Sequence, residues 1–187
     1  MTFRIDITSD IYTLCHGPAH RGDDISGLAY VPTLPPTDPC FHGYVPDNAT
    51  QVNDLPNLRF DLIGYAPWVN GNCSLQYLAS AAADHANTKA MIFYTVVNGN
   101  KSAVMPDEDD PMWDIGFGGY EFPIYAINGA QGEVLMSKIA TYSRNMTDVW
   151  ESPALAQTYD VDDYARVYIK VDTGMYLDLS CRLLCKC

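Results

Sequence analysis

Residues 58–95 decide the fold of this chain, and they open with the short apolar run RFDLIGY at 59–65. A second apolar run, AMIFYTVV at 90–97, has the length and composition of a buried strand. Between the runs, residues 73–87 carry apolar side chains at the three- and four-residue steps of one buried helical face: Leu75, Leu78, Ala79, Ala82 and Ala86. This order predicts a βαβ crossover with two parallel strands and a right-handed connection.

A strand followed by a helix is predicted again at residues 122–142. The run FPIYAI at 122–127 predicts a third buried strand, and the next stretch supplies apolar side chains for a second helix: Val134, Leu135, Ile139 and Ala140. Residues 26–31 predict a further strand, which the prolines of 32–39 prevent from continuing. We therefore expect an α/β domain with a mixed, largely β core and two helices.

Strands are also predicted near both ends of the chain. Residues 2–8 alternate apolar and polar side chains, which is typical of a half-buried strand. Residues 165–171 and 175–179 alternate around a short turn and predict a hairpin. The expected organisation is one domain of 187 residues, in which cysteine-containing terminal extensions, 1–25 and 143–187, pack on a core at 26–142.

Composition excludes some classes of function. With 48% hydrophobic residues the chain has enough apolar side chains for a core, and its net charge of -12 disfavours nucleic acid as a partner. No stretch approaches the roughly 20 apolar residues that cross a bilayer. Residues 1–8 lack the apolar core of a secretory signal, so either the protein is cytosolic or its signal and further domains lie outside this sequence.

Glycosylation motifs and cysteines favour the second of these options. Sequons of the form Asn-X-Ser/Thr lie in predicted loops or at element ends and begin at Asn48, Asn72, Asn100 and Asn145. The 6 cysteines are an even number and match no cofactor signature, so three disulfides are favoured over free thiols: Cys15, Cys40, Cys73, Cys181, Cys185 and Cys187. We expect a secreted or lumenal protein.

Motif order then points to a family. A strand leads into Gly-Asn-Cys-Ser at 71–74 and a helix, then into Lys-Ala-Met-Ile-Phe-Tyr at 89–94 and an acidic loop, and finally into Phe-Pro-Ile-Tyr-Ala-Ile-Asn-Gly-Ala-Gln-Gly-Glu at 122–133. This order resembles the protease-associated domain over roughly residues 26–142. The chain departs from the family at 75–77, where Leu-Gln-Tyr replaces the usual aromatic residue after the Cys-Ser/Thr pair.

The resemblance implies a fold and a disulfide. Its β core would be an open barrel or a sandwich with two or more helices, and Cys40 would pair with Cys73. Cys15 would then pair with one of three C-terminal cysteines, which ties the terminal strands together: Cys181, Cys185 and Cys187. The remaining two would pair with each other or with an outside partner.

The resemblance also implies a function. Domains of this family are non-catalytic lumenal or extracellular modules that bind protein or peptide, recruit substrates or regulate an attached domain. Their hosts include membrane-anchored ubiquitin ligases, vacuolar sorting receptors and secreted peptidases, of which the first two fit this chain better. We expect no catalytic residue, metal or cofactor. The alternatives are a secreted hydrolase, an appendage of a secreted peptidase, and a structural, oligomerising ectodomain.

Two surfaces are candidates for ligand binding. A Gly-rich loop near the carboxyl ends of the parallel strands carries large apolar side chains that could anchor a peptide or cap the core: Met112, Trp113, Phe117 and Tyr120. The other surface is the turn at 67–71 with Trp68 and Asn70, beside a helix N-terminus that suits a peptide carboxylate.

Other chemistries are weaker interpretations. His16 and His20 straddle a proline in a loop, so helical spacing does not align them as metal ligands. The three C-terminal cysteines could hold zinc only in a reducing compartment. The acidic residues 107–114 lack the alternating ligands of a calcium loop. Cys73 at a helix N-terminus would be a nucleophile only as a free thiol.

Overall fold

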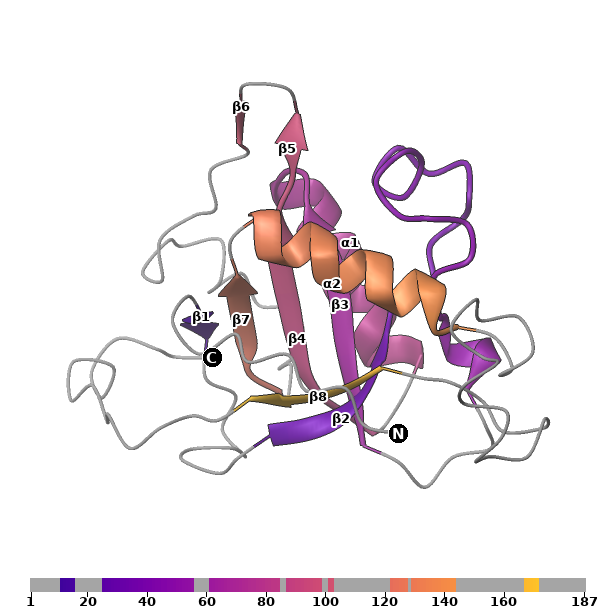
Figure 1. Ribbon diagram of the computed structural model, residues 1–187, viewed down its shortest axis with the longest axis vertical. Coiled ribbons are helices and arrows are strands. Elements are labelled where there is room, and N and C mark those ends of the chain that lie inside the picture. Colours follow the sequence, from indigo (N-terminus) through magenta and orange to yellow (C-terminus); the bar gives the residue numbers. More distant parts are fainter. Residues whose placement is uncertain are drawn as a thin grey trace, which may run out of the picture.

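The main sheet has six strands around a parallel centre. The computed structural model describes residues 11–15, 25–55, 61–84, 87–98, 101–102, 122–127, 129–143 and 167–171. The strands lie in the order β1 (Ile11–Cys15), β7 (Ile124–Ile127), β4 (Thr88–Thr95), β3 (Leu62–Trp68), β2 (Ile25–Tyr30) and β8 (Tyr168–Val171) (Figure 1). The four inner strands are parallel, and the outer strands β1 and β8 are antiparallel to their neighbours. The expected mixed α/β class is confirmed.

The predicted βαβ crossover is also confirmed. Strand β3, helix α1 (Gly71–Asp84) and strand β4 follow one another, and the two strands pair in parallel. Strand β3 begins at Leu62, later than predicted, and continues through Pro67, which has no N–H to donate. Proline is tolerated there because β2 pairs only with the first three residues of β3, which leaves that edge open beyond Gly64.

The second predicted repeat is incomplete. Strand β7 leads into helix α2 (Gly129–Thr141), but the next described strand is β8, which pairs antiparallel with β2 at the far side of the sheet. Strands β5 (Val97–Asn98) and β6 (Lys101–Ser102) pair as a small antiparallel ribbon on either side of the expected turn. The described strands thus make one open sheet and a ribbon, so they do not pack as a sandwich.

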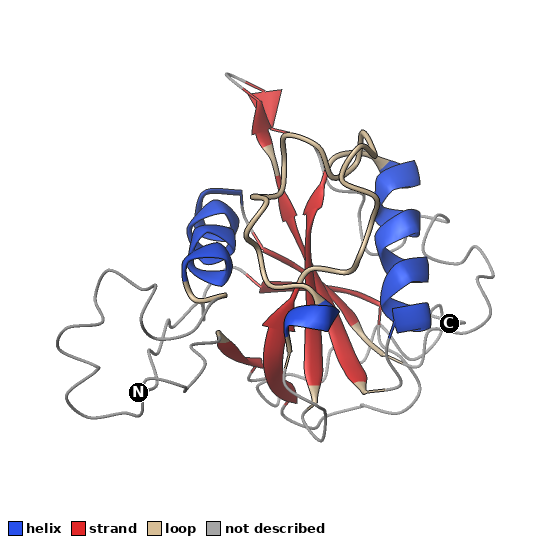
Figure 2. Cartoon of the chain, turned by 90° about the vertical axis from the view of Figure 1, so that its right-hand side faces the viewer, coloured by secondary structure: helices blue, strands red, loops and turns tan. Residues whose placement is uncertain are grey.

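The two helices cover opposite faces of the main sheet (Figure 2). The hydroxyl of Tyr65 in β3 donates to the carbonyl of Gly132 in α2, whereas the hydroxyl of Thr88 in β4 donates to the carbonyl of Ala81 in α1. Every residue of β3 is buried, as expected for a central strand with helices on both sides. No helix in the described ranges is long and apolar enough to cross a membrane.

The buried face of α1 differs from the prediction. Leu78 is buried, but Leu75 is half-buried and Ala79 and Ala82 are exposed. The face that contacts the sheet is instead Cys73, Ser74, Tyr77, Leu78 and Ala81. Alanines at neighbouring positions make the hydrophobic pattern of this helix ambiguous. The tertiary contacts of Cys73 and Tyr77 therefore determine which face is buried.

Helix α2 buries most of its predicted side chains. Leu135, Ile139 and Ala140 are buried, whereas Val134 is 56% exposed and its prediction as a core residue is wrong. The buried positions follow the steps of a single helical stripe that starts at Gly129, and Val134 lies outside that stripe. The predicted strand at 2–8, residue Ala86 and the second hairpin strand at 175–179 lie outside the described residues.

Candidate functional site

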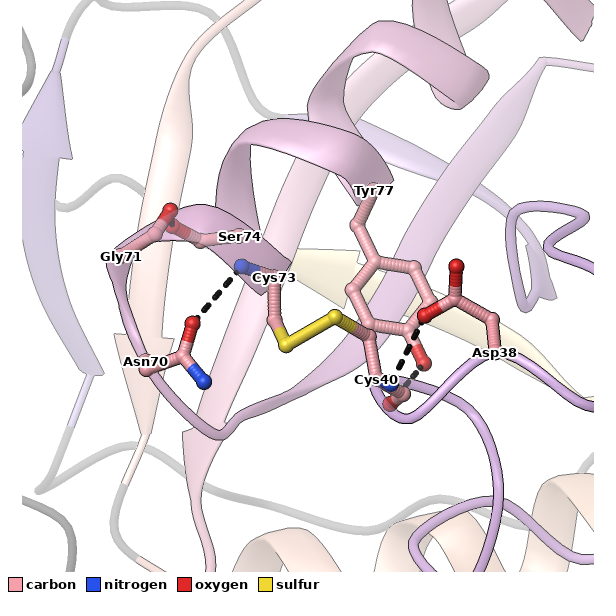
Figure 3. Close-up of a disulfide and its surroundings, with 7 residues drawn as sticks. All are labelled: Asp38, Cys40, Asn70, Gly71, Cys73, Ser74 and Tyr77. Carbon is pink, nitrogen blue, oxygen red and sulfur yellow. Dashed lines mark hydrogen bonds between the residues drawn. A yellow bond between two sulfur atoms is a disulfide. The ribbon is translucent and has the colours of Figure 1, made fainter.

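A disulfide holds the loop after β2 against helix α1. Cys40 and Cys73 are bonded, with their Cα atoms 5.2 Å apart, and they lie 33 positions apart in sequence. Figure 3 shows the bond between the loop and the first turn of the helix. Both cysteines are buried. The bond confirms the pairing expected from the family resemblance and leaves Cys73 without a free thiol. The pairing of Cys15, Cys181, Cys185 and Cys187 lies outside what the structure describes.

Asn70 caps the first turn of α1, directly after strand β3. Its side-chain oxygen accepts a hydrogen bond from the backbone N–H of Cys73 at 3.0 Å, which is the contact of a helix N-cap (Figure 3). The Ser74 hydroxyl donates to the carbonyl of Gly71 at 2.7 Å. The first turn is therefore stabilised by its own polar groups while Asn70 and Asn72 are exposed to solvent.

The backbone of Cys40 is held on both sides. Its N–H donates to the Asp38 carboxylate at 2.8 Å, and its carbonyl accepts from the Tyr77 hydroxyl at 2.9 Å (Figure 3). Burial, followed by the nearby Tyr94 and Asp38, raises the pKa of Tyr77 well above its ordinary value. The phenol therefore stays protonated and keeps donating to the loop.

The same loop continues across to helix α2, and we call residues 31–55 the bridging segment. The Tyr94 hydroxyl donates to the carbonyl of Tyr44 at 3.4 Å. Near the C-terminal end of α2, the Asn48 amide donates to the carbonyl of Ala140 at 3.0 Å and the Thr50 hydroxyl donates to the carbonyl of Ile139 at 3.3 Å. These bonds satisfy carbonyls that the last turn of a helix leaves without partners. The bridging segment thus links both helices.

Of the predicted ligand-binding residues that the structure describes, one lies in the core and the other on the surface. Trp68 is only 3% exposed and packs edge to face on Phe93, with ring centroids 5.8 Å apart, so it belongs to the core and does not present its ring to a ligand. Asn70 is exposed, although its oxygen is used by the cap. The other expected surface lies outside the described residues and stays a prediction: Met112, Trp113, Phe117 and Tyr120.

A stacked pair of buried tyrosines, which was not predicted from the sequence, packs the main sheet against helix α2. The rings of Tyr65 and Tyr94 lie parallel with centroids 5.2 Å apart, and the Tyr65 hydroxyl donates to the carbonyl of Gly132 at 2.9 Å. Burial and then Tyr94 raise the pKa of Tyr65, and burial and then Glu133 raise the pKa of Tyr94. These phenols remain neutral and serve packing. For Tyr65 the sequence signal was its place at the end of the apolar run 59–65.

The described residues contain no group of three or more His, Cys, Asp or Glu side chains placed to hold a metal. The histidine pair, the acidic stretch and the C-terminal cysteines weighed as ligands all lie outside the described ranges.

No protein-family model, curated protein or solved structure matches the chain. Fold and site together define a mixed α/β domain whose bridging segment is fixed to one helix by a disulfide.

Removing the cap of α1 should cost stability. We expect Asn70→Ala to lower the free energy of unfolding by about 1 kcal/mol, because the N–H of Cys73 loses its side-chain acceptor. Asn72→Ala, in the same exposed turn, is the matched control and should stay within about 0.5 kcal/mol of the wild type. Urea unfolding followed by circular dichroism measures both, and equal losses would argue against the cap.

Two buried tyrosines should respond oppositely to loss of their hydroxyl. Tyr65→Phe should lower the free energy of unfolding by about 1 kcal/mol because the bond to Gly132 is lost. The hydroxyl of Tyr125 is buried without a hydrogen-bond partner in the described structure, so Tyr125→Phe should raise stability by about 1 kcal/mol. Denaturant midpoints test the pair, and a loss in both variants would mean that Tyr125 has a partner.

Stability should fall above pH 10. Burial raises the pKa of Tyr125 from 10.0 to about 12, so both states are protonated below pH 10 and only the unfolded state loses its proton just above it. The free energy of unfolding then falls by about 1.4 kcal/mol per pH unit for each such tyrosine, until the folded phenol also ionises. Urea midpoints between about pH 8 and 11 should decline less steeply in Tyr125→Phe, and an equal slope would contradict the assignment.

Proposed function

We propose that this chain is a non-catalytic module of the protease-associated type, placed in a secretory lumen or outside the cell, that binds protein or peptide. The observation that carries the proposal is the Cys40–Cys73 disulfide, formed at the Gly-Asn-Cys-Ser turn from which the family resemblance starts. Structural disulfides persist mainly in oxidising compartments, which supports this location. The sequons are compatible with the same compartment.

The proposed binding surface lies beside the disulfide. Open α/β sheets place ligands at the carboxyl ends of their parallel strands, and here strand β3 ends next to the N-terminus of α1. The bridging segment is fixed at this position and exposes His42, Gly43 and Asp47. In the first helical turn the N–H of Cys73 is bonded to the side chain of Asn70 and that of Ser74 to the carbonyl of Asn70. The N–H groups before them, of Gly71 and Asn72, are therefore the ones that suit a carboxylate of a bound peptide.

The role of the module in a larger protein is proposed from the kinds of protein that carry such domains. A module of this kind recruits substrates to, or regulates, another domain of the same protein, for which we propose a membrane-anchored ubiquitin ligase or a sorting receptor. This part of the proposal rests on the family resemblance. Binding by the isolated chain is the part that can be tested first.

A peptide screen on the oxidised chain tests the binding. The protein, produced in a eukaryotic secretory host, is panned against random peptides with a free or an amidated C-terminus, and hydrogen exchange maps the contact. We expect protection at residues 38–48 and 69–74, and at least a tenfold loss of affinity in Cys40→Ala/Cys73→Ala. Glu133→Ala, an exposed change on α2, is the control and should bind normally.

Three outcomes would contradict the proposal. Protection confined to other segments would reject the site. Turnover of ester, peptide or glycan substrates without peptide affinity would favour a secreted hydrolase. A stable dimer without peptide affinity would favour a structural ectodomain.

A further inference from the structure

The sequon at 48–50 is closed in the folded chain. The Asn48 amide nitrogen, which would carry a glycan, donates to the carbonyl of Ala140 at 3.0 Å. Thr50 is 1% exposed, and its hydroxyl donates to the carbonyl of Ile139 at 3.3 Å. Both groups that define this sequon are therefore engaged with the end of helix α2.

The sequon at 72–74 is closed in a different way. Asn72 is exposed, and its side chain makes no hydrogen bond in the described part of the chain. Ser74 is 0% exposed and donates to Gly71, while Cys73 between them is 4% exposed and bonded to Cys40. The folded state has room for a glycan on Asn72 but withholds the hydroxyl by which the sequon is recognised.

The chemistry of glycan transfer requires both groups at once. The asparagine amide nitrogen attacks the anomeric carbon of a lipid pyrophosphate-linked oligosaccharide. The new N–C bond forms as the C–O bond to the pyrophosphate breaks, the lipid pyrophosphate leaves, and the amide nitrogen loses one of its two protons. The transferase also recognises the Ser/Thr hydroxyl two residues on, so transfer at either sequon must precede local folding.

We infer that Asn72 is a conditional glycosylation site whose occupancy is set by competition between glycan transfer and closure of the Cys40–Cys73 disulfide. Closure holds Cys73 in the first turn of α1 and buries Ser74 beside it. A glycan added earlier is retained, because Asn72 faces solvent. This inference rests on the secretory location in the proposed function, and such a glycan would stand beside Asn70 at the proposed peptide surface.

Opening the disulfide without touching the sequon tests the inference. Cys40→Ser, expressed in a eukaryotic secretory host, leaves residues 72–74 unchanged and is the decisive variant. Cys40→Ser/Cys73→Ala also removes the unpaired thiol, although it changes the middle residue of the sequon. Occupancy is measured by mass spectrometry after enzymatic glycan release in heavy-oxygen water. We expect occupancy of Asn72 to rise at least twofold in both variants. Tyr65→Phe keeps the disulfide and the sequon but weakens the fold, so its occupancy should match the wild type.

Several results would overturn the inference. Full occupancy of Asn72 in the wild type, or no rise in either cysteine variant while Asn145 carries glycan, would show that the disulfide does not limit transfer. An equal rise in Tyr65→Phe would assign the effect to slower folding. Bare asparagines at all four sequons would remove the secretory location as well. Peptide affinity is measured separately, so the inference can fail while the proposed binding stands.

Discussion

Replacing Cys40 and Cys73 together by alanine should lower the free energy of unfolding by about 3–4 kcal/mol. The bond joins residues 33 positions apart, so its removal returns the conformational freedom of a long loop to the unfolded chain. In the folded state the bridging segment would still be held to α1 by the hydrogen bond that the Tyr77 hydroxyl donates to the carbonyl of Cys40. The bond from the Cys40 N–H to the Asp38 carboxylate would still stabilise the segment itself. We therefore expect a folded but much less stable protein.

Tyr77→Phe is the matched control for this prediction. It removes another link between α1 and the bridging segment, the bond to the carbonyl of Cys40, and should cost about 1 kcal/mol. Because the disulfide also restricts the unfolded chain, the double variant should show a steeper dependence on urea, whereas Tyr77→Phe should not. Equal losses and equal slopes would mean that the disulfide acts only as a local contact.

The central part of the fold could be predicted from the sequence because its signals are local. Strands buried on both faces are short, continuous apolar runs, and β3 and β4 both show this pattern. The disulfide was reached through the family resemblance, which placed Cys40 upstream of the Gly-Asn-Cys-Ser turn. The mixed α/β class followed from these elements.

Predictions of which side chains point into the core and which face solvent were less successful. Trp68 follows a proline and was assigned to a turn, but β3 continues to Trp68 because the β2 edge is already open at that point. The face of α1 could not be chosen from a helix rich in alanine, since small apolar residues lie on several sides. In both cases the deciding contacts came from other segments.

The contact between α2 and the sheet was outside the reach of sequence reasoning altogether. Tyr65 and Gly132 are 67 positions apart, and nothing in the stretches 59–65 and 122–133 pairs one with the other. A glycine inside a predicted helix signals close packing only in general terms. Its partner becomes evident only when β3 and α2 are seen together.

Gly132→Ala should lower the free energy of unfolding by about 3 kcal/mol or more. A β-carbon at this position would lie 2.1 Å from Cβ and 2.4 Å from Cγ of Tyr94, so the helix or the strand must move. Tyr94 cannot turn aside easily, because it is 2% exposed and its ring stacks on Tyr65. The higher helix propensity of alanine offsets only about 1 kcal/mol of this cost.

Gly64→Ala separates the clash from the general effect of adding a methyl group. There the nearest atom is the Met91 sulfur at 2.5 Å, at the flexible end of a side chain that can adopt another rotamer, so the loss should stay near 1 kcal/mol. Urea unfolding gives both values, and near-ultraviolet circular dichroism reports the environment of the tyrosine rings. If Gly132→Ala failed to fold while Gly64→Ala folded, that result would also support the predicted clash at Gly132. If the two variants were equally stable, α2 would be free to move away from the sheet, and the bond from Tyr65 would not fix its position.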